Sequence, residues 1–320
     1  MASFFILIFS FFFFGSVPRG EIAYPLCGSE GTSQSPIDIV SSPSTAAAAA
    51  AAAAATADDP ASAVDLTPTD VEQPRRAGPE DPFSAAAAAP VSSSPSSSQT
   101  GTVGDFVRPP ASLPLTLTVK QNYGTPYYHC EPPDPDAGTS VTGAFCGCLV
   151  DKNDGEKMYA LDSIHFHAPS ENTVDGKAYP MEMHMVHVAD DGALAVLGVL
   201  FEHAVDATAA NEAMTKLMEQ HTAGGGGGGG GEGGEGSDDK VEVDTSALYD
   251  ASSGFWTWNG SLTTPPCSEG VLWMLQKKTE KVTAADANAF KEHVGGYPGT
   301  ARPTQPLNGR TVTSYEPAAN

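Results

Sequence analysis

Short apolar runs separated by glycine, proline and aspartate recur through much of the chain. Their valine, leucine, methionine and aromatic residues favour β-strands. The runs that we expect to form strands read LPLTLTVKQ, MYALDSIHFHA, YPMEMHMVHVA, ALAVLGVLFEH, FWTWNGSL and GVLWMLQKK. Two other segments, DATAANEAMTKLMEQH and TAADANAFKEHV, are predicted helices. The pattern therefore predicts a mainly β fold with few short helices, built on one large sheet.

Two low-complexity segments interrupt this pattern. Residues 41–104 contain runs of alanine and clusters of serine, proline and threonine. Such a segment has too little branched or aromatic surface to offset its ordering entropy, so we interpret it as a disordered insertion. A run of glycines makes residues 224–240 a predicted flexible loop. The expected single domain comprises residues 21–40 and 105–320.

An apolar block, Phe4–Phe14, stands near the N-terminus and is followed by small and polar residues. Its length is typical of a signal peptide, which we expect over residues 1–20; the alternative is a misassigned start or a buried strand. No later segment is long and apolar enough to span a bilayer, so we expect no stable membrane insertion. We expect a secreted protein, extracellular or periplasmic, or one that reaches an organelle lumen through the secretory route.

The charge balance narrows the choice of partners. The chain has 39 acidic and 16 basic residues and a formal net charge of -23. Nucleic acids and anionic membranes need clustered lysine and arginine, so neither is an expected partner. Five cysteines in an exported chain suggest disulfides with one thiol left over, but spacing alone leaves the pairing open. Cys146 and Cys148 lack a second pair to complete a metal site, so we expect a disulfide or a free thiol there.

Two histidine clusters carry the candidate chemistry. In a strand, residues i and i+2 point to one face, so His165 and His167 project side by side. Taken alone, such a pair is more often two partly exposed strand histidines than half of a metal site. In the second cluster, EMHMVH, residues Glu182 and His184 share one face, and His187 lies on the other. Three neutral imidazoles with a fourth position open are typical of a catalytic zinc site, and a carboxylate beside a ligating histidine orients the ring.

A third element, NGSLTTPPCSEGVLW, contains a rigid turn that presents hydroxyl groups near a strand end. Alone it is an ordinary proline-stiffened loop. Together with the histidine clusters it makes the chain resemble the α-class carbonic anhydrases. The motifs that carry the resemblance are QSPIDI from Gln34, HFH from His165, SE from Ser170, EMHMVH from Glu182, LAVLG from Leu194, GSLTTPPC from Gly260 and RPTQPL from Arg302.

The resemblance implies a single domain around a large twisted, mostly antiparallel sheet, with zinc at the base of a conical cleft. It implies that Zn2+ is the cofactor, with His165, His167 and His184 as its ligands. The implied reaction is the reversible hydration of CO2 to bicarbonate and a proton, by attack of zinc-bound hydroxide. Thr263 would accept a hydrogen bond from that hydroxide, because Glu171 takes the threonine hydroxyl proton.

The resemblance also assigns supporting residues. Glu182 would hold His184, and Ser163 stands where a glutamine commonly supports the first zinc ligand. Secreted members of the family often join cysteines at the positions of Cys27 and Cys267. The substrate pocket would be formed by Val186, Val196, Leu262, Thr264, Val271 and Trp273. The alternative for the apolar residues of this set is that they are simply core.

The chain departs from the family at several positions. Thr125 stands where many members carry a proton-shuttling histidine, so we predict slower, buffer-dependent turnover. His129 is the nearby candidate shuttle; the alternative is an exposed histidine without a role. Asn172 replaces a common histidine beside Glu171 and is expected to matter little. The family's aromatic segment before the first cysteine is missing, which indicates either an incomplete gene model or a member without that lid.

Two other functions are compatible with parts of the sequence. One is a catalytically silent carbonic anhydrase-like binding domain, but such relatives usually lose zinc-binding histidines, and this chain retains all three. The other is an unrelated zinc hydrolase, but no H-E-x-x-H motif is present.

Overall fold

The computed structural model describes residues 25–28, 30–41, 98–122, 125–131, 145–223, 240–294 and 300–319. The predicted signal peptide lies outside these residues. So do most of the predicted insertion, residues 42–97, and all but the last residue of the predicted glycine-rich loop.

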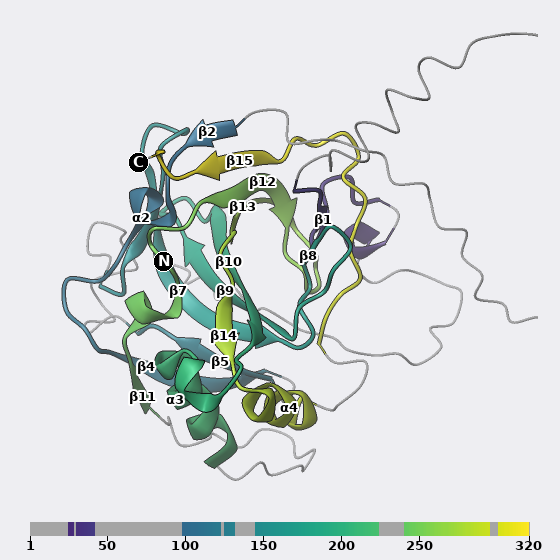
Figure 1. The fold of residues 1–320 in the computed structure, drawn as a ribbon. Coiled ribbons are helices and arrows are strands. Elements are labelled where there is room, and N and C mark those ends of the chain that lie inside the picture. The colour runs from purple at the N-terminus through teal and green to yellow at the C-terminus, as the bar shows by residue number, and fades with distance from the viewer. Residues whose placement is uncertain are drawn as a thin grey trace, which may run out of the picture.

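A large, mixed and twisted sheet organises the described part of the chain (Figure 1). Along the sheet the strands follow the order β11, β4, β5, β7, β9, β10, β13, β12, β15 and β2, with β3, β6 and β14 attached beside this path. The bounds of the strands are β2 Ser98–Thr100, β3 Val107–Arg108, β4 Leu115–Asn122, β5 Thr125–His129, β6 Cys148–Asp151, β7 Lys157–His167, β9 Met181–Val188, β10 Leu194–His203, β11 Lys240–Val243, β12 Phe255–Ser261, β13 Glu269–Gln276, β14 Glu280–Val282 and β15 Thr313–Glu316. A separate two-stranded ladder pairs β1, Asp38–Ile39, with β8, Thr173–Val174.

Most neighbouring strands run antiparallel, whereas β10 is parallel to both β13 and β14, and β2 is parallel to β15. This architecture confirms the predicted mainly β fold and adds that the sheet is mixed. The six strands expected from the sequence are β4, β7, β9, β10, β12 and β13. The other strands are two to five residues long, too short for a hydrophobic period to identify them.

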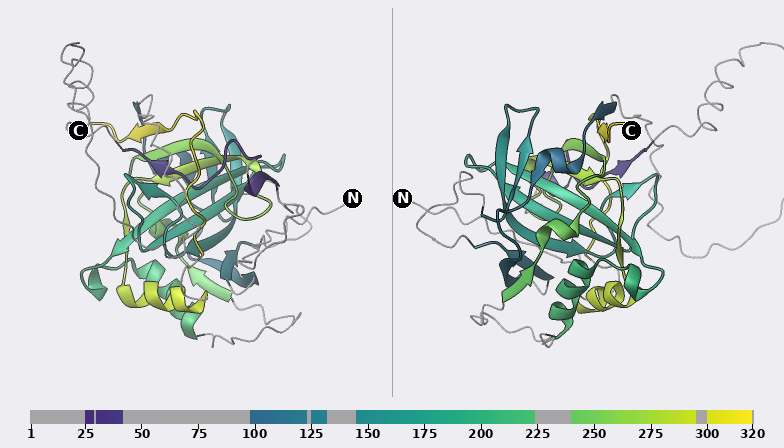
Figure 2. Two further views of the ribbon diagram at one scale, coloured as in Figure 1. Left: turned by 90° about the vertical axis from the view of Figure 1, so that its right-hand side faces the viewer. Right: turned by 60° about the vertical axis from the view of Figure 1, so that its left-hand side comes forward.

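Both predicted helices are present, as α3, Glu212–Ala223, and α4, Ala284–His293. They lie next to each other on one side of the sheet in all three views (Figures 1 and 2). Helix α4 begins after Thr283, whose side chain accepts a hydrogen bond from the Asp286 backbone N–H, as an N-cap residue does. The described residues also include three short 3-10 helices: η1 Pro25–Cys27, η4 Ala207–Ala209 and η5 Thr245–Leu248.

The end of the predicted insertion is ordered, unlike our expectation for residues 98–104. These residues form β2 and the start of a short helix, α2, Val103–Phe106. The physical reason is aromatic packing: Phe106 is buried, and its ring contacts those of Phe255 and Tyr315 with centroids 5.0 and 5.3 Å away. Strand β2 is also held by its hydrogen bonds to β15.

The two faces of the sheet carry two different hydrophobic clusters. One face packs against α3 and α4 and includes Met183, Met185 and Phe166. The other includes Val186, Val196, Leu200, Trp258 and Trp273. Because the central strands are covered on both faces, β9 is buried almost from end to end, including its polar residues Glu182, His184 and His187.

Two disulfides are present among the described residues. Cys27 is joined to Cys267, as the resemblance implies, with a Cα–Cα distance of 5.2 Å. Cys130 is joined to Cys146, which leaves Cys148 as a buried free thiol. The first bond attaches the N-terminal segment to the loop that follows β12, and the second connects the end of β5 to the start of β6.

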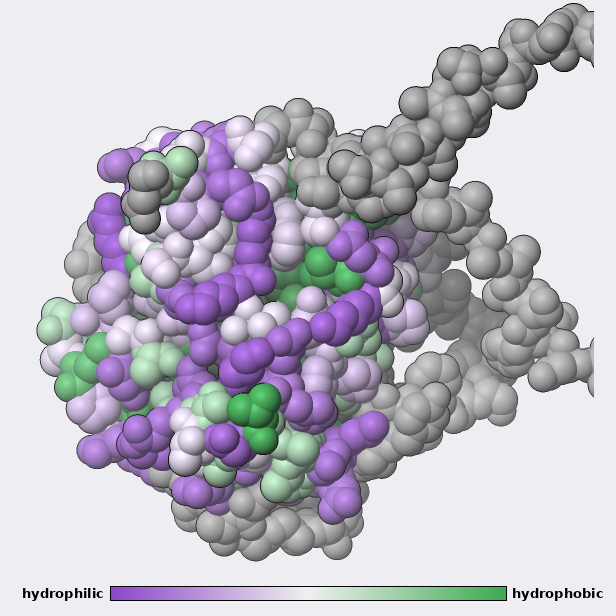
Figure 3. Space-filling model, in the orientation of Figure 1, coloured by the Kyte–Doolittle hydropathy of each residue, from purple (hydrophilic) through white to green (hydrophobic). Residues whose placement is uncertain are grey.

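Hydrophilic residues dominate the face of the molecule shown in Figure 3, and hydrophobic residues form small separate areas between them. This surface agrees with the strongly acidic composition of the chain. Within the described residues, we find no helix with the length and apolar character that a membrane span requires.

Candidate metal centre

Three histidines from two neighbouring strands converge on one side of the sheet. His165 and His167 are on β7, His184 is on β9, and their candidate ligand atoms all lie within 4.8 Å of one another. The antiparallel register places His165 directly opposite His184, and His167 opposite Glu182. A bulge between Leu161 and Ser163 ends before the first histidine, so the two-residue alternation holds across the cluster. The face assignment predicted from the sequence agrees with this arrangement.

Hydrogen-bond partners on the outer side of the rings indicate which nitrogens face inward. The Nδ1 atom of His167 lies 3.0 Å from the carbonyl oxygen of Thr300. A carbonyl oxygen can only accept a hydrogen bond, so Nδ1 carries the ring proton. The opposite nitrogen, Nε2, is buried and has no hydrogen-bond partner among the described residues. The Nδ1 atom of His184 and the Nε2 atom of His165 face each other at 3.3 Å.

Glu182 defines the orientation of His184. Its Oε1 lies 3.0 Å from His184 Nε2, the distance of a close ion pair, although the ring N–H is not aligned for a strict hydrogen bond. A proton on Nε2 leaves the lone pair of His184 on Nδ1, facing His165. Three ring lone pairs therefore point toward a common space, and this arrangement suits a metal ion.

Burial and charge set the protonation of the three rings. Burial, together with the neighbouring imidazoles, holds the pKa of His165 well below its ordinary value. Burial also lowers the pKa of His167, although Glu171 acts in the opposite direction. For His184, burial lowers the pKa, but the Glu182 carboxylate outweighs it and raises the pKa overall. Neutral rings at His165 and His167 are the protonation state that metal ligation requires.

Exposure differs among the three rings. His167 and His184 are buried, whereas His165 is partly exposed. The His184 ring also packs edge-on against Trp273, with centroids 4.9 Å apart. The cluster is thus enclosed on the His184 side, and His165 is its most exposed ring.

Glu171 lies beside the cluster with one oxygen occupied and one free. Its Oε1 accepts a hydrogen bond from the Arg302 backbone N–H at 2.9 Å. Its Oε2 is buried, lies 3.4 Å from His167 Nε2, and has no hydrogen-bond partner among the described residues. Thr263 is also largely buried and follows the end of β12. The expected Thr263–Glu171 hydrogen bond is not among those formed by the described residues.

The predicted pocket residues lie in one part of the molecule. Val186, Val196, Val271 and Trp273 belong to the hydrophobic cluster on the histidine side of the sheet, and Leu262 packs against it. Thr264 is partly buried in the turn after β12 and is not a member of the cluster.

Strand β5 contributes side chains that sequence reasoning largely missed. Its register with β7 places Tyr127 directly opposite His165, and His129 opposite Ser163. Since opposite residues of an antiparallel pair share a face, both side chains lie on the histidine side. Burial along β5 alternates, but the sequence TPYYH has no matching alternation of polar and apolar residues, so no sequence signal identifies Tyr127. Ser163 is buried, but no hydrogen bond joins it to His165 within the described part of the chain.

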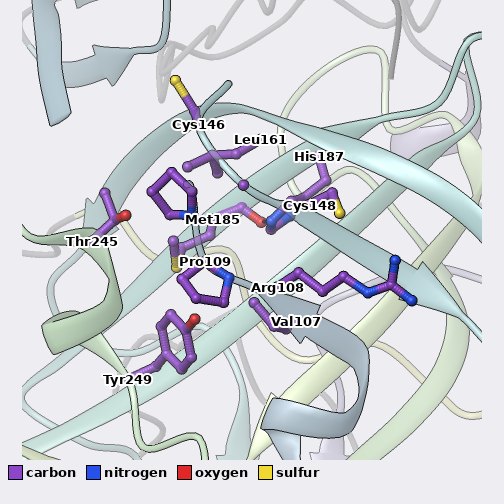
Figure 4. Close-up of a pocket in the computed structure, with 12 residues that line it drawn as sticks. Val107, Arg108, Pro109, Cys146, Cys148, Leu161, Met185, His187, Thr245 and Tyr249 are labelled. Carbon is purple, nitrogen blue, oxygen red and sulfur yellow. Dashed lines mark hydrogen bonds between the residues drawn. The ribbon is translucent and has the colours of Figure 1, made fainter. Parts of the chain in front are cut away.

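The free thiol of Cys148 is not part of the histidine cluster. Cys148 and His187 line a small cavity of about 10 Å³ together with Arg108, Met185 and Tyr249 (Figure 4). The side chains of Cys146 and Cys148 point in different directions there. Burial raises the pKa of the Cys148 thiol, and a cavity of this size holds one water molecule at most. As expected, this cysteine pair is not a metal site, since it forms one half of a disulfide and one free thiol.

Comparisons with known proteins identify the family. A family model described as eukaryotic-type carbonic anhydrase matches residues 147–316, a segment that contains all three histidines as well as Glu171 and Thr263. The chain belongs to this family. Its members are zinc enzymes, and three neutral imidazoles with an open fourth position are a suitable set of ligands for Zn2+.

Individual relatives support the same assignment. The chain is 38% identical to a carbonic anhydrase of Klebsiella pneumoniae over 154 residues, which cover 48% of this chain and 57% of that protein. It is 35% identical to alpha carbonic anhydrase 4 of Arabidopsis thaliana over 173 residues, 52% of this chain and 60% of the relative. The match thus spans little more than half the length of these relatives.

A solved structure supports the fold. The structure of α-carbonic anhydrase from Thermovibrio ammonificans in complex with sulfanilamide superposes with a TM-score of 0.55 at 25% identity. The alignment covers 91% of this chain and 90% of that one.

Proposed function

We propose that this chain holds one zinc ion through His165, His167 and His184 and catalyses the reversible hydration of CO2 to bicarbonate and a proton. The observation that carries the proposal is the convergence of three ring lone pairs within 4.8 Å, in a chain of the carbonic anhydrase family. A bound zinc ion supplies a Lewis acid that makes water a nucleophile near neutral pH.

The residues around the cluster have distinct tasks in this proposal. Glu182 and the carbonyl of Thr300 hold the outer nitrogens of His184 and His167, so the rings keep their orientation while the reaction proceeds. The carboxylate of Glu182 is kept ionised, although it is fully buried, because His184 and two donors of Asn172 lower its pKa against the effect of burial. These contacts preorganise the site.

Thr263 and Glu171 orient the attacking oxygen. The free Oε2 of Glu171 is the acceptor that a threonine hydroxyl needs in order to present only its lone pairs to the nucleophile. The proposal therefore includes a hydrogen bond from the Thr263 hydroxyl to Glu171 when the site is loaded. The backbone N–H of Arg302 holds the other carboxylate oxygen and so prevents Glu171 from turning away.

The apolar side chains near the cluster suit an apolar substrate. CO2 has no hydrogen-bond donor and no net charge, so its site needs a hydrophobic wall. Val186, Val196 and Trp273 provide such a wall next to His184, and Trp273 is in direct contact with that ring. Leu262 and Val271 extend it toward the turn that carries Thr263 and Thr264. Core packing and substrate contact are compatible roles for these residues.

Release of the proton is the step for which this chain is least equipped. Thr125 cannot carry a proton between the site and solvent. His129 lies on the same face of the sheet as His165, is partly exposed, and its Nδ1 is 3.8 Å from Asp162 Oδ1. We assign the relay to His129, assisted by buffer, and expect turnover to depend on buffer concentration.

Export to an oxidising compartment fits the cysteine chemistry. Disulfides persist in secreted and periplasmic proteins and in lumenal compartments of the secretory route. The two disulfides and the apolar N-terminal block together support this localisation.

Stopped-flow measurement of CO2 hydration on zinc-loaded protein tests the proposal. His184→Ala should reduce the rate to that of buffer, because it removes one of three ligands and leaves Glu182 without its partner. The control is His203→Ala, since His203 is exposed at the end of β10, away from the cluster, and its loss should leave the rate unchanged. A zinc-loaded wild-type protein that does not accelerate hydration would contradict the proposal and favour a silent binding domain.

A further inference from the structure

The geometry points to Asn172 as a positioning residue that holds Glu182 against the metal ligand His184 and connects that ligand to the N-terminal segment. Sequence reasoning expected little from Asn172. In the structure, however, its side chain is fully buried and both of its side-chain polar atoms have partners. The catalytic meaning of the inference rests on the proposed function, but its test does not.

The Glu182 carboxylate is surrounded by donors. Its Oε2 accepts hydrogen bonds from the backbone N–H groups of Glu171 and Asn172, both at 2.8 Å. Its Oε1 accepts one from Asn172 Nδ2 at 2.7 Å and lies 3.0 Å from His184 Nε2. A buried carboxylate with this many donors has a fixed position and a fixed direction for its remaining lone pairs.

The other end of the Asn172 amide determines which way it points. Its Oδ1 accepts a hydrogen bond from the backbone N–H of Ile37 at 3.0 Å. Because the oxygen is occupied by Ile37, the NH2 group must face Glu182. Only a side chain with a donor and an acceptor at these two places serves both partners, so neither aspartate nor leucine can replace it.

Close packing on the opposite side completes the arrangement. Gly198 lies across from His184 in the register of β9 and β10. A Cβ atom at this position would be 3.2 Å from Glu182 Oε1. A side chain at this position would therefore crowd the carboxylate, whereas glycine leaves it the space that it occupies beside His184.

The contact with Ile37 extends the network to the N-terminal segment. Arg302 donates hydrogen bonds to Gln34 Oε1 and to the Ser35 carbonyl, while its backbone N–H holds Glu171. Segment 34–39 is thus attached to the metal site through Asn172 on one side and Arg302 on the other. We infer that displacement of this segment loosens the orientation of His184 through Asn172.

The test compares zinc affinity, measured by competition with a chelator, between wild type, Asn172→Asp and Asn172→Leu. Asn172→Asp keeps the acceptor for Ile37 and loses the donor to Glu182, whereas Asn172→Leu loses both. We expect the dissociation constant for zinc to rise about 10- to 100-fold in each variant. The visible spectrum of the cobalt(II)-substituted protein should change as well, because it reports the geometry of the ligands.

Gln276 provides the matched control. It is also fully buried, and its amide also joins two backbone groups, the N–H of Asp250 and the carbonyl of Lys278. Gln276→Glu and Gln276→Leu should change stability without changing zinc affinity or the cobalt spectrum. Equal losses of affinity in the Asn172 and Gln276 variants would overturn the inference, because they would reflect a general cost of removing a buried amide.

An Asn172→Asp protein that is folded and binds zinc as wild type does would also overturn the inference. If Asn172→Leu does not fold, Asn172→Asp alone decides the question, because it is nearly isosteric. CO2 hydration by the wild type is measured separately. A wild type that binds zinc without hydrating CO2 would end the proposed function and leave this inference intact.

Discussion

Removal of the Cys27–Cys267 disulfide should destabilise the protein more than removal of Cys130–Cys146. The perturbation is a pair of double substitutions, Cys27→Ser with Cys267→Ser, and Cys130→Ser with Cys146→Ser. The two bonds differ mainly in the length of chain that they close. The first joins residues separated by 240 positions and the second residues separated by 16.

The magnitude follows from the entropy of the unfolded chain. Closing a loop of the shorter length restricts the unfolded state by about 3 kcal/mol, and closing the longer one by about 5 kcal/mol. The expected difference in the free energy of unfolding is therefore about 2 kcal/mol. Removal of the first bond should also loosen the loop between Thr263 and Cys267. This disulfide is the cross-link that attaches the end of that loop to the N-terminal segment.

Urea-induced unfolding followed by fluorescence measures both changes. Cys148→Ser is the matched control, because Cys148 is a buried cysteine that forms no disulfide, so its replacement reports the cost of serine at such a site. The free energy of unfolding should fall in the order control, Cys130/Cys146 variant and Cys27/Cys267 variant.

A smaller loss for the Cys27/Cys267 pair than for the other pair would refute this reasoning. It would mean that hydrogen bonds already hold the N-terminal segment, chiefly those that Glu269 accepts from Thr32, Ser33 and Gln34. It would also mean that the long loop is compact in the unfolded state.

Three further predictions concern single residues. Burial lowers the pKa of His187 to about 4 from 6.5. Between these pH values the unfolded state binds more protons than the folded state. The free energy of unfolding therefore falls by about 3 kcal/mol as the pH drops from 6.5 to 4. Urea unfolding of His187→Gln at both pH values should lack this part of the loss. Gly198→Ala should cost about 1 to 3 kcal/mol in thermal unfolding, because its Cβ would lie 2.8 Å from Leu275 Cδ1 and would press on Glu182. Added imidazole should raise the CO2 hydration rate of the wild type, and more so of His129→Ala; a rate that does not respond would show that proton release is not limiting.

The sequence predicts the centre of the fold better than its edges. Strands β7, β9 and β10 are eight or more residues long. Their apolar residues alternate with others in β7 and β9 and form a nearly continuous run in β10, so each strand can be recognised in the sequence. Strand β5, TPYYH, contains a proline and a histidine and offers no clear run, although it lies next to β7. Short strands depend on their neighbours for stability, and local sequence does not carry that information.

In the candidate site, too, the sequence predicts the residues on long central strands but not those in loops. The two-residue period of β7 and β9 predicts which histidines face each other, because both strands are regular between His165 and His184. The role of Asn172 could not be predicted in this way. It lies after β7 in a loop, and its partners are a side chain on β9 and a backbone group more than a hundred residues earlier. The sequence also does not predict whether Cys130 pairs with Cys146 or with Cys148, because these two cysteines are only two residues apart.

Zinc titration of metal-free protein, with CO2 hydration followed at each step, tests the central claim most directly. The rate should rise in proportion to added zinc and stop rising at one ion per chain. Because His165, His167 and His184 are the proposed ligands, a variant without one of them should gain no activity. Stoichiometric zinc binding with no hydration above the buffer rate would contradict the claim that this site is a working carbonic anhydrase centre.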